Sequence, residues 1–79
     1  MEMEAVNLYK KACDRNGSLA CLSLGVLYIN GEGVPKSLKQ AEVVMRKSAK
    51  LFKAECEKGI ELSCDYYNKV YDLGFGVEE

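Results

Sequence analysis

The sequence predicts an all-α fold, a solenoid of α/α hairpins with about four antiparallel helices. Three observations lead to this prediction. Apolar residues recur at helical spacing along most of the chain. A glycine-rich segment, "GVLYINGEGV" at 25–34, returns as "NKVYDLGFGV" at 68–77. Two cysteine pairs share one spacing, with seven residues between their members, and each pair precedes one copy of this segment.

Two offsets describe the internal repeat. At 43 residues, Cys21 matches Cys64, and Tyr28 matches Tyr71. At 36 residues, the segment 5–12 matches the segment 41–48. The difference of seven residues is about two helical turns. We therefore expect a unit of 36 residues whose second helix is two turns longer in the middle copy. Repeats of this length are typical of helical solenoids.

The first half of the chain predicts two helices, at 3–14 and 18–30. Each carries apolar residues spaced three and four apart, which is the pattern of a helix with one buried face. Gly31 is expected to end the second helix in a left-handed conformation. The expected buried stripes are Ala5, Leu8, Tyr9 and Ala12 in the first helix, and Leu19, Leu22, Val26 and Ile29 in the second, widened by Leu24 and Leu27.

The second half predicts helices at 37–58 and 61–73. Ser37 followed by Gln40 is typical of a capping box at a helix start. In both turns a valine, Val34 or Val77, is expected to pin the loop onto the core. The expected stripes are Leu38, Ala41, Met45, Phe52 and Cys56 in the third helix, and Leu62, Tyr66, Val70 and Leu73 in the fourth.

Composition excludes several classes of function. Seventy-nine residues allow one small domain, and the formal net charge is −1 with acids and bases interspersed. This argues against nucleic-acid binding, which needs a basic patch. No apolar run reaches the roughly 18 residues of a membrane span. The chain has no histidine, which excludes Ser-His and Cys-His catalytic pairs and the H-E-x-x-H zinc site. No cofactor or metal is expected.

These residues resemble the Sel-one-like repeat family, the solenoid relatives of tetratricopeptide repeats. The resemblance covers nearly the whole chain and implies one domain, 1–79, with one full repeat flanked by partial repeats. Two departures are Asn68 at the position of Gly25, and Met45 where the family usually has an aromatic residue. The residues that fit the family's pattern are Ala20, Leu24, Gly25, Leu27, Tyr28, Gly31, Gly33, Val34, Ser37, Gln40, Ala41 and Lys47.

The cysteines are similar to those of the family's cysteine-rich Hcp branch. That resemblance implies a disulfide between neighbouring helices in each pair, Cys13 with Cys21 and Cys56 with Cys64. The spacing agrees, because each pair straddles a predicted turn. A Cys₄ zinc site fits poorly, since zinc ligands usually come two to four residues apart, and four buried thiols are a third reading. Disulfides imply an oxidising compartment, such as the periplasm or the cell exterior.

The family resemblance implies a protein or peptide partner on the concave face, lined here by the helices at 18–30 and 61–73. Outward candidates for binding are Ser23, Asn30, Tyr66, Asn68 and Lys69. Tyr66 would supply an aromatic anchor, although tyrosines such as Tyr66 are more often packed in or against the helical core. Asn68 and Lys69 would hold a carboxylate. The lysine- and arginine-rich segments are expected to be a solvated face.

Two other hypotheses remain. The resemblance associates the Hcp branch with penicillin binding and β-lactam hydrolysis, but the S-x-x-K, S-D-N and K-T-G elements of serine β-lactamases are missing from the sequence. The second hypothesis is that the chain is a purely structural unit. The final turn has no helix after it in this sequence, so the apolar side of the last helix is expected to self-associate, to bind a partner, or to belong to a longer array.

Overall fold

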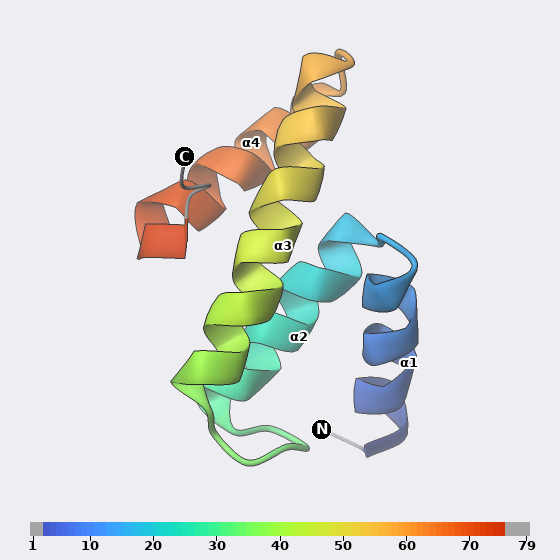
Figure 1. Ribbon diagram of the computed structural model, residues 1–79, viewed down its shortest axis with the longest axis vertical. Coiled ribbons are helices and arrows are strands. Elements are labelled where there is room, and N and C mark those ends of the chain that lie inside the picture. Colours follow the sequence, from blue (N-terminus) through green and yellow to red (C-terminus); the bar gives the residue numbers. More distant parts are fainter. Residues whose placement is uncertain (1–2, 76–79) are drawn as a thin grey trace.

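The computed structural model describes residues 3–75 and consists of helices. They are α1 (Met3–Asp14), α2 (Ser18–Asn30), α3 (Leu38–Glu57) and α4 (Glu61–Val70), followed by a π-helical turn, η1 (Tyr71–Phe75). Helix α2 packs between α1 and α3, and α3 packs between α2 and α4 (Figure 1). This order of contacts along the chain is that of stacked helical hairpins. The predicted all-α fold of about four antiparallel helices is confirmed.

Two groups of buried side chains form the core, and α3 contributes to both. Near the start of α3, Ala41 lies in a cluster with residues of α1 and α2, including Val6 and Leu27. Towards its end, Phe52 and Ala49 pack against Val70 of α4. The length of α3 is what allows one helix to contact α2 at one end and α4 at the other.

The side of α1 that was expected to be buried was wrong. Val6 and Cys13 are the buried positions, and Tyr9 packs against the first cluster, whereas Leu8 is 66% exposed and Ala12 is exposed. The physical reason is that α2 is the main neighbour of α1 among the described residues. A helix that packs mainly against one neighbour buries only a narrow strip of its surface. In α1 this strip consists of residues spaced three and four apart along the chain. The leucines at the outer edges of the other stripes, Leu38, Leu62 and Leu73, are also at least 60% exposed.

The two copies of the turn have corresponding backbone conformations where both are described. Gly31 ends α2 with φ 70°, and its N–H donates to the Leu27 carbonyl at 2.7 Å. Gly74, its counterpart, has φ 96°. Positive φ is strained for residues with a Cβ, so both copies need glycine at this position. Val34 packs against the first cluster as expected, and Val77 lies outside the described residues.

Ser37 begins α3 and joins it to the end of α2. Its hydroxyl accepts a hydrogen bond from the Gln40 backbone N–H at 3.2 Å, as the capping box predicts. The other hydrogen bond of a capping box, from the Ser37 N–H to the Gln40 side chain, is not formed. The Ser37 N–H donates instead to the Tyr28 carbonyl at 3.0 Å. The start of α3 is thus hydrogen-bonded to the preceding helix, which fixes the geometry of the hairpin.

Candidate binding groove

A groove of about 420 Å³ opens between α1, α2 and α4. Its size is within the range of small-molecule and peptide sites, which is roughly 300–1,000 Å³. Helix α3, which packs against α2 and α4, contributes no lining residue. The residues that line the groove are Tyr9 of α1, Leu19, Leu22, Ser23, Val26 and Leu27 of α2, Glu32 of the turn, and Tyr66 of α4.

The floor of the groove is the apolar surface of α2. This helix, "SLACLSLGVLYIN", has no charged residue. Because α1 and α3 cover only part of its circumference, apolar side chains remain on the side facing solvent. Leu19 is 49% exposed and Val26 is 41% exposed. The sequence predicts these two residues in a buried stripe, and the structure shows instead that they form the accessible floor.

Tyr66 forms the wall of the groove on the α4 side. Its ring stacks on Phe52 of α3, with ring centroids 5.2 Å apart and an interplanar angle of 20°. The ammonium of Lys69 lies 5.9 Å from the centroid of the Tyr66 ring, within the range of a cation–π contact. The wall is thus an aromatic ring packed on α3, with a cation beside it. Glu32 gives the groove a negative charge at the turn.

The structure brings together some of the residues predicted to bind. Ser23 and Tyr66 both line the groove, and Lys69 lies beside it through its contact with Tyr66. Asn30 and Asn68 are exposed but are not among the lining residues. Asn68 occupies the repeat position of Gly25, which packs against α3. It therefore belongs to a different side of α4 from Tyr66, and the binding role of all five residues stays a prediction.

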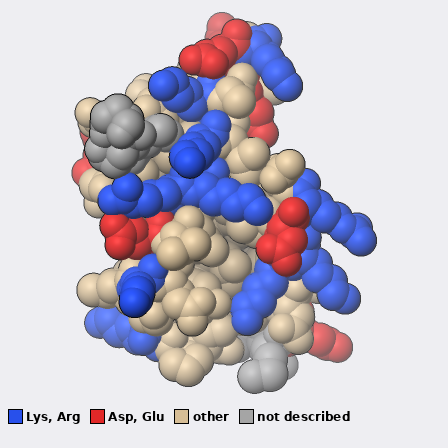
Figure 2. Space-filling view, viewed as in Figure 1, with Lys and Arg blue, Asp and Glu red and all other residues tan. Residues whose placement is uncertain are grey.

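Charged side chains cover a separate surface. Lysine and arginine side chains spread over the face shown in Figure 2, with acidic side chains between them. Among the residues expected to form a solvated face, Lys10, Lys11 and Lys50 are exposed, while Arg46 and Lys47 are half-buried. Arg46 pairs with Glu42 at 2.8 Å. These charged side chains lie on α1 and α3, whereas most residues that line the groove are apolar residues of α2.

Two disulfides join neighbouring helices. Cys13 at the end of α1 is bonded to Cys21 in α2, and Cys56 at the end of α3 is bonded to Cys64 in α4. Their Cα–Cα distances are 4.7 and 4.6 Å. The predicted pairing is confirmed. Because no cysteine is free, none remains to bind zinc or to form a buried thiol. Disulfides are compatible with an oxidising or secreted location.

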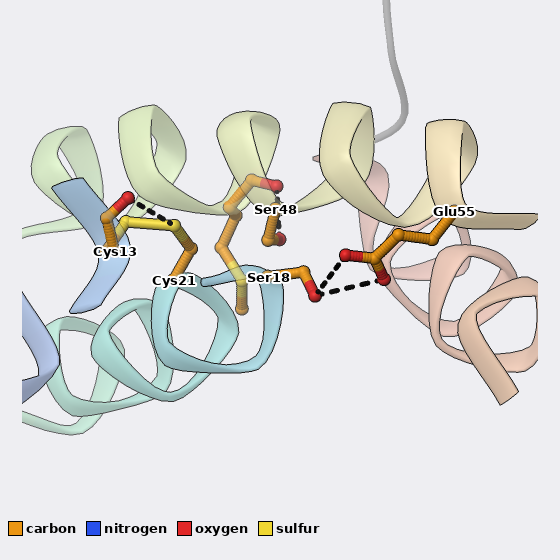
Figure 3. Close-up of a disulfide and its surroundings, with 6 residues drawn as sticks. Cys13, Ser18, Cys21, Ser48 and Glu55 are labelled. Carbon is orange, nitrogen blue, oxygen red and sulfur yellow. Dashed lines mark hydrogen bonds between the residues drawn. A yellow bond between two sulfur atoms is a disulfide. The ribbon is translucent and has the colours of Figure 1, made fainter. Parts of the chain in front are cut away.

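A hydrogen-bonded carboxylate connects three helices, and sequence reasoning missed it. Glu55 of α3 accepts from the Ser18 hydroxyl at 3.1 and 3.2 Å and from the Ser63 hydroxyl at 2.6 Å. Figure 3 shows the Ser18 hydroxyl pointing toward the Glu55 carboxylate, with Ser18 between Glu55 and the Cys13–Cys21 disulfide. Ser18 begins α2 and Ser63 lies in the first turn of α4. No periodic pattern marks these residues, because each is a single polar position on a different helix.

None of the helices in residues 3–75 combines the length and apolar character required to cross a bilayer.

Comparisons with known proteins give one partial similarity. No protein-family model matches the chain, and no solved structure matches it. Over 37 residues the chain is 46% identical to a protein of Helicobacter pylori (strain J99) named "Putative beta-lactamase HcpC". The match covers 47% of this chain and 13% of HcpC, so the chain spans a small fraction of the length of this relative.

Proposed function

We propose that the chain is a helical repeat module that binds a protein or peptide segment and has no catalytic activity of its own. Residues 1–79 would form a single Sel-one-like repeat domain, with one full repeat flanked by partial repeats. The repeated turn, the stacked hairpins and the two disulfides support this assignment. The partial similarity to HcpC supports it too, since that name carries the label of the branch that the cysteine pairs resemble.

The groove between α1, α2 and α4 is the observation that carries the proposal. Leu19 and Val26 expose apolar surface inside a concave site, and burying such surface in a complex is favourable by about 25 cal/mol per Å². Tyr66 is already fixed by its stacking on Phe52, so little side-chain freedom is lost when a ligand contacts it. A preformed apolar floor with an aromatic wall is typical of peptide-recognition sites.

The groove favours a particular kind of segment. Apolar side chains of the ligand would cover Leu19 and Val26, and a carboxylate would lie near the Lys69 ammonium at the α4 end. A basic group would suit the other end, where Glu32 lies. No nucleic-acid or membrane partner is proposed. The disulfides lead us to place the protein in the periplasm or outside the cell, where such bonds persist.

A selection with a randomised peptide library, followed by titration calorimetry, tests the proposal. Val26→Lys places a charge on the floor of the groove and should weaken binding of the selected peptides at least tenfold. Val43→Lys is the matched control, because Val43 is a 66% exposed helix valine that does not line the groove. It should bind like the wild type. Equal binding by both variants, or a selection that yields no binder, would contradict the proposal.

β-Lactam hydrolysis is the second candidate, and the name of the partial relative favours it. The Ser63 hydroxyl donates to the Glu55 carboxylate at 2.6 Å, an arrangement in which a carboxylate acts as base toward a serine. However, Ser63 is only 6% exposed and does not line the groove. A chromogenic cephalosporin assay on the pure protein separates the candidates. Turnover that disappears in both Ser63→Ala and Glu55→Gln would establish the enzyme and displace the binding module.

A further inference from the structure

The outer side of α4 differs from its repeat counterpart on α2. Gly25 is buried against Met45 of α3, and Tyr28 is 5% exposed in the first core cluster. At the offset of 43 residues, their counterparts on α4 are Asn68, which is exposed, and Tyr71, which is 58% exposed. Helix α4 and its extension thus keep accessible a side that α3 covers in the first copy. Among residues 3–75, α3 and η1 are the main neighbours of α4.

On α1, the positions that correspond in the repeat to buried positions of α3 are accessible. At the offset of 36 residues, the segment 5–12 matches 41–48. In α3 the positions Ala41 and Ser48 are fully buried, and Val44 packs against the first core cluster. The matching positions of α1 are accessible. They are Ala5, which is half-buried, Leu8, which is 66% exposed, and Ala12, which is exposed.

The charges of α1 and α4 are complementary when the helices run antiparallel, as α2 and α3 do within their hairpin. Glu61 and Asp65 lie in the first half of α4, Lys11 lies in the last turn of α1, and Arg15 directly follows that helix. All four are exposed. In the last turn of α4, exposed Lys69 would face the first turn of α1, where exposed Glu4 lies. These groups are opposite in charge at both ends of the pair, although exposed Asp14 and Asp72 also lie at the two ends.

From these observations we infer that α4 of one copy packs against α1 of a second copy, head to tail. The second copy's α1 takes the place that α3 has beside α2, with Leu8 on the side of Tyr71 and Asn68. A contact between two different surfaces leaves one free surface at each end of the pair, so the assembly grows into open chains or closes into rings. The inference shares Lys69 with the proposed peptide groove. Its test uses Leu8 and Tyr71, neither of which lines the groove, so the two proposals can fail separately.

Analytical ultracentrifugation of two interface variants tests this arrangement. Leu8→Glu disables the α1 surface and leaves α4 intact, whereas Tyr71→Glu does the reverse. The wild type should show an average mass that rises with concentration, and each variant alone should be a monomer. Their equimolar mixture should form a 1:1 dimer that does not grow, because only one productive surface of each variant remains. Val43→Glu on α3 is the control and should associate like the wild type.

Several outcomes would overturn the inference. One is a wild type that stays monomeric over the same concentrations. Another is a single variant that associates as the wild type does, which would indicate a symmetric contact of one surface with itself. A mixture of the two variants that stays monomeric is the third. Circular dichroism of each variant establishes that the helices are formed, and the dimer of the mixture would show that both partners are folded.

The charged residues allow a second, independent test of the inference. Replacing both Glu61 and Asp65 by lysine should weaken self-association at low salt, and replacing both Lys11 and Arg15 by glutamate should do the same. A mixture of these two double variants restores opposite charges across one contact and should associate more strongly than either alone. Association that is the same in all four samples would show that charge does not direct the contact.

Discussion

Gly25 of α2 lies directly against Met45 of α3. A Cβ at position 25 would stand 2.7 Å from both Cγ and Sδ of Met45, closer than such atoms approach in proteins. Met45 is fully buried, so its side chain has no open space into which it can turn. The absence of a side chain at Gly25 therefore sets how closely α2 and α3 approach. Gly25 and the floor of the groove both belong to α2, so the same contact also fixes the position of the floor.

Gly25→Ala should destabilise the protein. Alanine favours a helix over glycine by about 1 kcal/mol, but overpacking a full core costs about 1–3 kcal/mol, so the clash with Met45 decides the sign. We expect a net loss of about 1 kcal/mol in the free energy of unfolding, measured by urea denaturation. Asn68→Ala, at the matching repeat position on α4, is exposed and should be neutral or stabilising by about 0.5 kcal/mol. A Gly25→Ala variant more stable than the wild type would show that the two helices can separate freely.

Removing either disulfide should cost about 2.5 kcal/mol, because each closes a loop of nine residues with a sequence separation of 8. The paired serine variants, measured separately, test this value. The two bonds differ in accessibility. Cys13 and Cys21 are 3% and 0% exposed, whereas Cys56 and Cys64 are half-buried. Under mild reductant, alkylation and mass spectrometry should find Cys56 and Cys64 modified first. The reverse order would mean that opening of α1 precedes opening of α4.

Glu55→Ala should weaken the contacts among α2, α3 and α4 together. The carboxylate accepts from Ser18 and Ser63, and its loss leaves two hydroxyls without this partner. We expect a loss of about 2 kcal/mol, and about half of that for Glu55→Gln, which keeps one oxygen acceptor. Glu57→Ala on the same helix is the control and should stay within about 0.5 kcal/mol, because Glu57 is exposed.

A double-mutant cycle shows whether the hydrogen bond itself is responsible. Ser63→Ala should cost less in the Glu55→Ala background than in the wild type, because its acceptor is already gone. Additive effects of the two substitutions would instead indicate that Ser63 contributes through packing alone.

The helices were predictable because each is long and periodic and ends at a recognisable signal. Helices α1 and α2 begin and end where the sequence predicts, and α3 differs by one residue at each end. The fourth helix differs more, since α4 ends at Val70 and η1 follows. Periodicity identifies a helix but does not say how many neighbours it has. For this reason Leu8 was expected inside and lies outside.

The groove was only partly predictable from the sequence. Ser23 and Tyr66 were chosen from the expectation that the first helix of each hairpin lines the concave face, and the structure places both in the groove. Leu19 and Val26 were missed, because an apolar residue on a helix made mostly of apolar residues gives no signal of its exposure. The Glu55 hydrogen bonds were missed for a different reason. They join residues 37 and 8 positions apart, and only the packing of α2, α3 and α4 brings them together.

The most direct test of the binding module is an amide chemical-shift map, recorded by NMR while a peptide from the library selection is added. The largest shifts should fall on Leu19, Ser23 and Val26 in α2 and on Tyr66 in α4, and they should be lost in Val26→Lys. Amides of the outer side of α3, around Val43, should not move. Shifts concentrated along α3, or spread evenly over the chain, would contradict a peptide site in the groove.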